Sequence, residues 1–111
     1  MRLALVLLVA ACDPPPITMA EMPCPATGTQ LTYAGFGKPF LDANCNICHA
    51  DHIHGAPEAY TFGTLDQVVA RRERIFVRAA ATNTTMPPGP EDPALDDREK
   101  LAEWLSCGAP P

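Results

Sequence analysis

Apolar residues recur at helical spacing in the middle of this chain, and no stretch shows the alternation of apolar and polar residues that a strand would require. The clearest helix follows Thr64, which with Gln67 three residues later makes the sequence of a capping box. Beyond this box, apolar and small residues repeat with a period of about 3.6 as far as Ala80. The pattern therefore predicts an amphipathic helix with one buried face.

Two further helices are indicated on either side of this one. The first covers about residues 38–48, with Pro39 in its first turn, where proline is tolerated. The last begins at Asp96, with Glu99 as the partner in its capping box, and ends at Gly108. Its buried stripe consists of Leu101, Trp104 and Leu105. The sequence thus predicts an all-α fold of about three main helices separated by long loops.

The first of these helices ends in a C-x-x-C-H run formed by Cys45, Cys48 and His49. This spacing is the attachment signature of a covalently bound c-type haem. One helical turn brings both thiols along one edge of the macrocycle, where each forms a thioether with a vinyl group, and it leaves the histidine beneath the iron. We therefore expect one covalent haem held by Cys45 and Cys48, with His49 as an axial ligand.

Two other kinds of site use the same residues. A thioredoxin-like redox pair requires a strand before the first cysteine, and no β-branched run precedes Cys45. A zinc site could use Cys45, Cys48 and two of His49, His52 and His54, but structural zinc sites more often add a second, well-separated pair of ligands. Both alternatives are weaker than haem.

The beginning of the chain is typical of an exported protein. Residues 1–11 have a basic start, a short apolar run and small residues before Cys12, as a signal peptide does. The ending resembles a bacterial lipobox, in which Cys12 becomes the lipidated first residue; cleavage after Ala11 that leaves a free thiol is the alternative. A lipidated Cys12 and a proline-rich tether over residues 12–33 would then precede a domain over residues 34–111. We expect a protein of the bacterial periplasm or cell envelope, anchored to a membrane by acyl chains.

The remaining cysteines, Cys24 and Cys107, are expected to form a disulfide, because an exported chain experiences oxidising conditions. The alternatives are two free thiols or pairing between molecules. A bond between these two residues would close most of the mature chain into a loop, which the chain-entropy model values at roughly 4–5 kcal/mol.

The charge of the chain is acidic. Seven basic and thirteen acidic side chains remain after residues 1–11, a formal charge of −6, which argues against a nucleic-acid partner. Docking on a basic redox partner is compatible with this charge. Arg71, Arg74 and Arg78 share one face of the central helix. They form either a solvated stripe or a contact with haem propionates or an acidic partner.

Met86 is the best candidate for the second axial ligand of the iron. It lies in the proline-braced loop over residues 84–88, 37 residues after His49, and such a loop would hold a weak thioether ligand at little entropic cost. His52 and His54 compete for this role, but they lie too close to His49 to reach the opposite face easily. The carbonyl of Pro57 could accept the Nδ1 proton of His49 and fix its tautomer.

With these features the chain resembles the class I monohaem cytochromes c, in particular small bacterial ones anchored as lipoproteins. The resemblance rests on the helix ending in C-x-x-C-H, the Pro57 loop, Met86-Pro87 and the closing helix over residues 98–105. It covers about residues 35–108. The resemblance implies a cytochrome c-like fold, wrapped around one haem, in which the N- and C-terminal helices pack together and an aromatic residue from each meets near the haem edge.

The chain departs from this family in one detail. Gly37 lies eight residues before Cys45, as in the family, but Leu41 occupies the usual aromatic position and Phe40 precedes it. Trp104 is therefore expected to contact Leu41 or Phe40.

The expected function is that of a monomeric, non-enzymatic carrier of single electrons, with membrane or periplasmic oxidoreductases as transient partners. The alternative is a ligand-binding, sensory or peroxidase-like haem domain in which Met86 leaves the iron.

Overall fold

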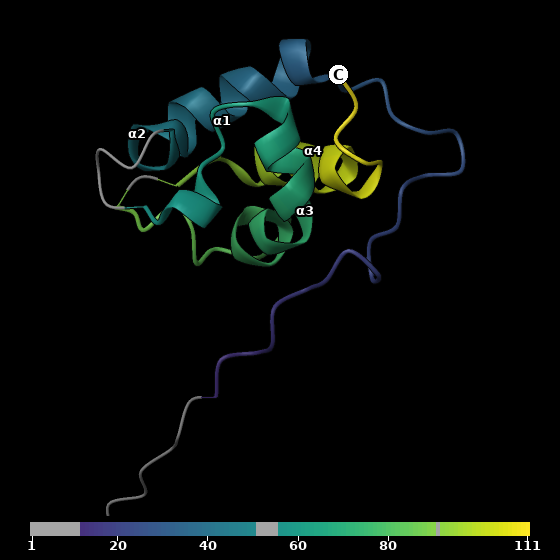
Figure 1. The fold of residues 1–111 in the computed structure, drawn as a ribbon. Coiled ribbons are helices and arrows are strands. Elements are labelled where there is room, and N and C mark those ends of the chain that lie inside the picture. Colours follow the sequence, from purple (N-terminus) through teal and green to yellow (C-terminus); the bar gives the residue numbers. More distant parts are fainter. Residues whose placement is uncertain (1–11, 51–55, 91) are drawn as a thin grey trace, which may run out of the picture.

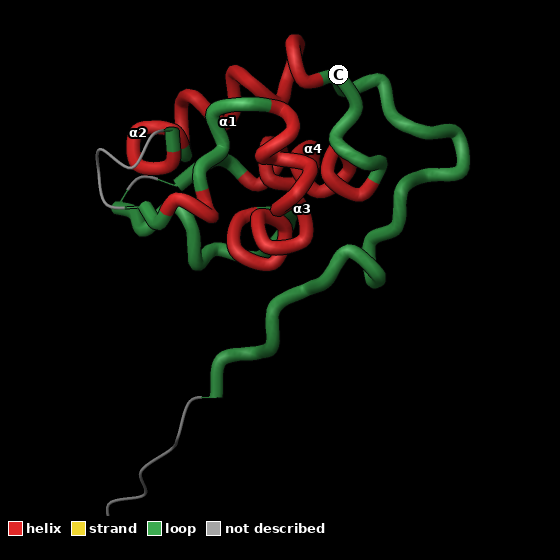
Figure 2. Tube along the Cα trace, viewed as in Figure 1, coloured by secondary structure: helices red, strands yellow, loops and turns green. Residues whose placement is uncertain are grey.

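Helices make up the ordered framework, as the apolar pattern predicts (Figures 1 and 2). The computed structural model describes residues 12–50, 56–90 and 92–111, and within these ranges there is no strand. The α-helices are α1 (Lys38–Asn44), α2 (Asn46–His49), α3 (Leu65–Ala79) and α4 (Leu95–Ser106). A π-helical turn (Tyr33–Gly37) leads into α1, and a 3₁₀ turn (Glu58–Tyr60) lies between α2 and α3.

The predicted first helix begins at Lys38, as expected, and a π-helical turn precedes it. The Thr32 side chain caps the π-helical turn by accepting a hydrogen bond from the Gly35 N–H at 3.0 Å. At Cys45 the backbone leaves the helical region, with φ −124° and ψ −46°, and α2 begins at the next residue. The C-x-x-C-H run therefore occupies a short turn set off from α1 rather than the end of one continuous helix.

The central helix α3 confirms its prediction in detail. The Gln67 N–H donates to the Thr64 side chain at 3.3 Å, and the Gln67 side chain accepts from the Thr64 N–H at 3.1 Å, so both halves of the capping box are formed. These bonds satisfy two of the backbone groups that the first turn of a helix leaves without partners.

The predicted start of the last helix is wrong. The Ala94 carbonyl accepts hydrogen bonds from the N–H groups of Asp97 and Arg98, both at 3.1 Å, so Ala94 rather than Asp96 is the N-cap residue. Asp96 lies inside the first turn, where its negative charge favours the positive end of the helix dipole.

The end of α4 agrees with the sequence. Gly108 has φ +94°, its N–H donates to the Leu105 carbonyl at 3.0 Å, and the Ala109 N–H donates to the Trp104 carbonyl at 2.9 Å. This is the Schellman arrangement, in which glycine supplies the left-handed residue.

Trp104 is fully buried at the junction of α4 with the π-helical turn. Its ring stacks on Tyr33, with centroids 6.2 Å apart, and meets Phe36 edge-on at 6.4 Å. Leu41 and Phe40, the residues expected to contact Trp104, are buried in the same core, and Gly37 approaches the ring closely. A Cβ atom at Gly37 would lie 2.4 Å from the tryptophan ring, so only glycine admits the ring here.

The proline-rich segment is packed along most of its length, contrary to the expectation of a free tether. From Ile17 onward, its apolar side chains Ile17, Met19, Met22 and Leu31 lie against the core. The Asn83 side chain accepts a hydrogen bond from the Ile17 N–H at 2.9 Å and donates to the Ile17 carbonyl at 2.7 Å. We call residues 17–31 the strap. Ahead of it, the chain extends away from the folded body (Figure 1).

The predicted disulfide between Cys24 and Cys107 is present, with the two Cα atoms 4.7 Å apart. It joins the middle of the strap to the residue that ends α4, and so links segments 83 positions apart in the sequence.

Candidate functional site

One short turn brings together the three residues of the C-x-x-C-H run. The N–H groups of Cys48 and His49 both donate to the Cys45 carbonyl, at 3.1 and 3.0 Å. Positions three and four residues apart lie on the same side of a helix, so the two thiols and the imidazole share one side of this turn. Each of the three is partly exposed.

The His49 ring is held in one orientation. Its Nδ1 lies 2.7 Å from the Tyr60 carbonyl oxygen, and because a carbonyl can only accept, Nδ1 carries the proton and Nε2 is left with a free lone pair. The ring also stacks on Phe62, with centroids 4.8 Å apart, and the Phe62 N–H donates to the His49 carbonyl at 2.6 Å.

The acceptor for His49 is therefore Tyr60 and not Pro57, as the sequence had suggested. The Pro57 carbonyl is occupied within the 3₁₀ turn, where it accepts the Tyr60 N–H at 2.8 Å. This turn shifts the free carbonyl three residues along the chain, to the position that faces the imidazole.

Cys45 differs from an ordinary surface thiol. It packs against the hydrophobic core, and burial raises its pKa to about 12, while the positive charge of Arg98 acts weakly in the opposite direction. The Cys45 thiol is therefore protonated at neutral pH. The third unpaired cysteine, Cys12, is exposed at the start of the described chain.

Met86 lies in the loop between α3 and α4, and its backbone is fixed at both ends. Its N–H donates to the Arg78 carbonyl at 2.8 Å, and its carbonyl accepts from Arg98 Nη1 at 2.9 Å. The Met86 residue is 39% exposed. These two hydrogen bonds join the Met86 backbone to residues of α3 and α4, and neither partner belongs to the C-x-x-C-H turn. In the view of Figure 1, the loop and α2 lie on the same side of the molecule.

Arg98 organises this loop, a role that the sequence analysis did not assign. It is only 2% exposed, and its Nη1 lies 2.7 and 2.9 Å from the carbonyl oxygens of Ala79 and Asn83, in addition to that of Met86. Its Nη2 contacts Asp92 at 3.2 Å. The sequence did contain a signal for this role, because Arg98 lies three positions before Leu101 and so falls on the apolar stripe of the last helix, where a charged residue is unusual.

Several predicted features fall outside the described residues, namely the signal peptide over residues 1–11 and the two histidines His52 and His54. Within the described ranges, no three His, Cys, Asp or Glu side chains form a group that could hold a metal ion. In the same part of the chain, no helix is long and apolar enough to cross a bilayer.

The residues present fit a c-type haem in their donor chemistry. Two thiols one helical turn apart can form two thioethers, and the adjacent imidazole offers an unprotonated Nε2 while its Nδ1 is bonded to a carbonyl. Comparisons with protein families, with curated proteins and with solved structures found no match to this chain.

Proposed function

We propose that this protein is a c-type cytochrome that carries single electrons, with one haem held covalently by Cys45 and Cys48. The observation that carries the proposal is the state of His49. The Nδ1 atom of His49, the residue directly after the second cysteine, is hydrogen-bonded to the Tyr60 carbonyl oxygen at 2.7 Å. This leaves Nε2 as a lone-pair donor for iron. When bound, the haem would supply a reversible one-electron change at its iron.

The residues around His49 would keep this ligand in place. The Tyr60 carbonyl fixes the tautomer and increases the basicity of the imidazole, as partners of metal-bound histidines do. The stacked Phe62 ring, itself 7% exposed, limits rotation of the imidazole. Together these contacts pre-orient the donor and reduce the entropy lost on ligation.

Met86 is the proposed second axial ligand. Its backbone is fixed by Arg98 and by the Arg78 carbonyl, whereas its side chain is not used in the core. A thioether ligand stabilises ferrous iron and raises the reduction potential. With His49 and Met86 both bound, no position remains for a substrate, which favours an electron carrier over an enzyme.

The disulfide supports an exported location, because such bonds persist in the periplasm and outside the cell. Cys12 would carry the acyl chains that anchor the protein to a bacterial membrane. Its partners would be redox proteins met transiently, and the short anchor would confine this search to the membrane surface.

Covalent haem attachment is tested by expression with a cytochrome c maturation system, followed by denaturing electrophoresis and a haem-peroxidase stain. We expect the wild-type band to stain and the Cys45→Ala/Cys48→Ala band to lose all stain. Cys12→Ser serves as the matched control, because it removes a thiol outside the motif and should retain the stain. An unstained wild-type band of normal abundance would overturn the proposal.

The role of Met86 is tested separately by the sulfur-to-iron charge-transfer band of the oxidised protein. Met86→Ala should abolish this band, and Met22→Ala, which removes a thioether from the strap, should leave it intact. Rapid carbon monoxide binding by the reduced wild-type protein would instead favour the second candidate, a ligand-binding haem domain. The exposed Met86 is the observation that keeps this candidate open.

A further inference from the structure

Helix α3 carries most of the basic charge of an otherwise acidic protein. Of the seven Lys and Arg residues that follow residue 11, four lie on this helix, against two carboxylates. They are Arg71, Arg72, Arg74 and Arg78. The ion pairs of the described residues involve Lys38, Arg98 and Lys100, so none of these four pairs with a described carboxylate.

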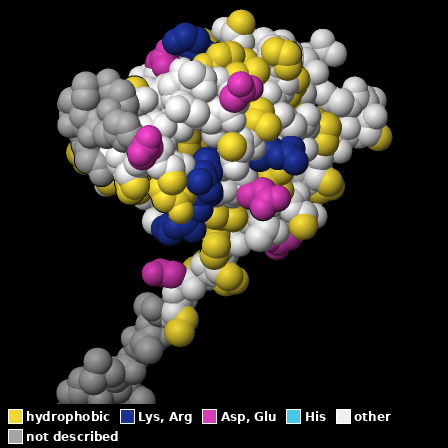
Figure 3. Space-filling view, viewed as in Figure 1, with side chains coloured by type: hydrophobic (Ala, Val, Ile, Leu, Met, Phe, Trp, Pro, Cys, Tyr) yellow, Lys and Arg dark blue, Asp and Glu magenta, His cyan; other side chains and the backbone are white. Residues whose placement is uncertain are grey.

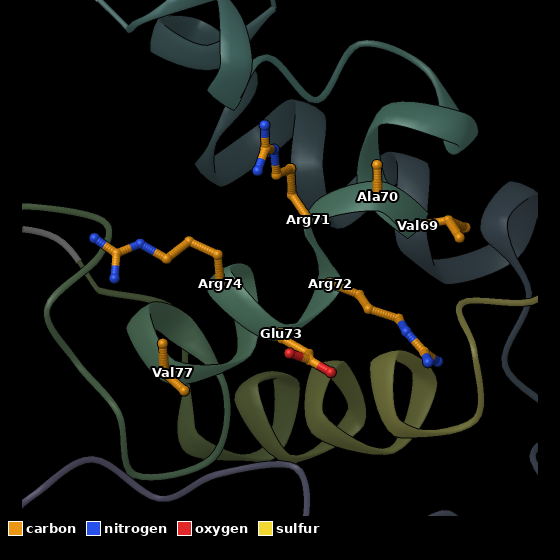
Figure 4. A pocket seen from close by; sticks show the side chains of 7 residues that line it. All are labelled: Val69, Ala70, Arg71, Arg72, Glu73, Arg74 and Val77. Atoms are coloured by element: carbon orange, nitrogen blue, oxygen red, sulfur yellow. The ribbon is translucent and has the colours of Figure 1, made fainter.

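Three of the four share a face. Arg71, Arg74 and Arg78 are spaced by three and four residues, and we call them the arginine face. Arg71 is held in place, since its Nε donates to the Ala59 carbonyl at 2.7 Å and its guanidinium lies 5.1 Å from the centre of the Tyr60 ring. Side chains of this helix line an open hollow on the surface. In Figure 4, Arg71 and Arg74 point away from Arg72. Arg72 instead lies beside Gly108 at the end of α4.

The strap enters the domain at the end of this same helix. Asn83, which binds Ile17 through two hydrogen bonds, also donates to the Phe76 carbonyl in the last turns of α3, at 3.0 Å. Only residues 13–16, Asp-Pro-Pro-Pro, separate Ile17 from Cys12. Such a proline run is extended and semi-rigid, so it spans about 16 Å at about 3.1 Å per residue.

The space-filling view places these two features together. In Figure 3, Lys and Arg side chains gather over α3, just above the point where the N-terminal segment leaves the body. A group attached to Cys12 would therefore lie about 16 Å from the point where the strap enters the domain at the end of α3.

We propose that the arginine face docks on the anionic headgroups of the membrane that holds the Cys12 anchor. This inference rests on the acyl anchor included in the proposed function. The short proline run confines the end of α3 to within about 16 Å of the bilayer surface. A tilt of the domain then brings the arginine face onto this surface, where the surface potential, which decays over a Debye length of about 8–10 Å, attracts it. The remaining surface of the protein is acidic and would be repelled, so the domain would rest on the membrane in one orientation.

The membrane is favoured over an acidic protein because the anchor would keep it within about 16 Å of the end of α3 at all times. The strap fixes this placement before any partner arrives, through the bonds at Asn83 and the disulfide at Cys107. Electrostatic attraction to anionic lipid then needs only a small movement of the domain to bring the arginine face to the membrane surface.

The test measures vesicle binding of the chain from residue 12 on, with Cys12→Ser so that no acyl chain contributes. The vesicles are phosphatidylcholine, with and without 30% phosphatidylglycerol, at low ionic strength. We expect Arg74→Gln/Arg78→Gln to weaken binding to the anionic vesicles by about fivefold for each arginine removed. Lys38→Gln/Lys100→Gln, which makes the same change in net charge on other helices, should have little effect.

A second measurement reports the orientation of the lipidated protein on nanodiscs. A spin-labelled headgroup should broaden amide resonances of α3 and of residues 17–19 more than those of α4, and Arg74→Gln/Arg78→Gln should remove this bias. Equal losses in both double variants, or even broadening over the whole domain, would overturn the proposal. It would also be overturned if the α3 variant bound vesicles normally but reacted more slowly with an acidic redox partner. Vesicle binding requires neither haem nor anchor, so its failure is distinguishable from failure of the proposed function.

Discussion

A single buried cation, Arg98, holds the loop that carries Met86. Its guanidinium satisfies carbonyl oxygens at the end of α3 and along the following loop, none of which has a strand or helix partner there. A buried charge is tolerated only when it is hydrogen-bonded in this way. The position of Met86 therefore depends on a residue of α4 that forms no hydrogen bond with the C-x-x-C-H turn.

Replacement of Arg98 by methionine should lower the free energy of unfolding by about 3 kcal/mol, because several buried carbonyls lose their only charged donor. Chemical denaturation checks this value. Lys100→Met is the matched control in the same helix, and since Lys100 is exposed its effect should remain within about 0.5 kcal/mol. Similar effects of the two substitutions would show that the Arg98 bonds do not stabilise the loop.

The raised pKa of Cys45 predicts low reactivity in the haem-free chain. With a pKa of about 12, almost none of this thiol is ionised at pH 8.5, and only the thiolate is nucleophilic. Iodoacetamide should therefore label exposed Cys12 well before Cys45, as peptide mass mapping would show. The difference between the labelling rates of Cys12 and Cys45 should become smaller as the pH approaches 12. Labelling of Cys45 as fast as Cys12 at pH 8.5 would contradict the raised pKa of Cys45.

The sequence predicted the residues whose chemistry depends on local spacing and missed those whose role depends on tertiary contacts. Cys45, Cys48 and His49 meet because one turn connects them, so the motif alone places them. The partner of His49 depends on the 3₁₀ turn after Pro57, and apolar spacing contains no information about which carbonyl such a turn leaves free. Arg98 was missed for the same reason, because its acceptors lie on other elements.

At the level of elements, helix α3 was predicted well and the start of α4 was not. The two cases have different causes. Thr64 and Gln67 form a capping box from side chains within four residues, whereas α4 begins at Ala94, whose side chain makes no cap. Asp96 and Glu99 have the spacing of a capping box, but the backbone is already helical at both residues, so they form no cap. The negative charge of Asp96 instead interacts favourably with the positive end of the helix dipole.

This difference gives a direct comparison of two substitutions. Thr64→Ala should lower the free energy of unfolding by about 1 kcal/mol through loss of the cap. Asp96→Ala should cost less, within about 0.5 kcal/mol, because Asp96 lies within the first turn and caps nothing. Thermal or urea unfolding of both variants measures the two losses in the free energy of unfolding. A larger loss for Asp96→Ala than for Thr64→Ala would indicate that Asp96 is the N-cap after all.

Across the whole molecule, the strap and the disulfide determine how the chain ends relate to the helices. The strap was predicted to be a semi-rigid tether outside the packed domain, because proline-rich, polar composition usually indicates a linker. Four apolar side chains and the bonds to Asn83 and Cys107 make it part of the domain instead. The cysteine count gave the pairing correctly, since only two cysteines remained once Cys12 was assigned to the expected lipid and Cys45 and Cys48 to the expected haem.

Removal of the disulfide by Cys24→Ser/Cys107→Ser should lower the free energy of unfolding by about 2–5 kcal/mol. The proton exchange of strap amides should rise at the same time, because the strap would lose its covalent link to the end of α4. Thermal unfolding and hydrogen exchange measure the two effects. Thr29→Ala, which removes a strap contact to Glu103 at 2.6 Å but leaves the disulfide, is a milder control. A stability equal to that of the wild type would contradict the structural role of the bond.

The route by which the strap joins the domain also decides how the molecule bears mechanical force. A pull on the N-terminus, such as the proposed anchor would transmit, would enter at Ile17 and pass to Asn83 and then through the disulfide to Cys107. Tension along this path is carried by the ends of α3 and α4, and α1 and α2 lie outside it. The covalent link also prevents such a pull from drawing out the chain between residues 24 and 107. The C-x-x-C-H turn is therefore shielded from tension applied at the N-terminus.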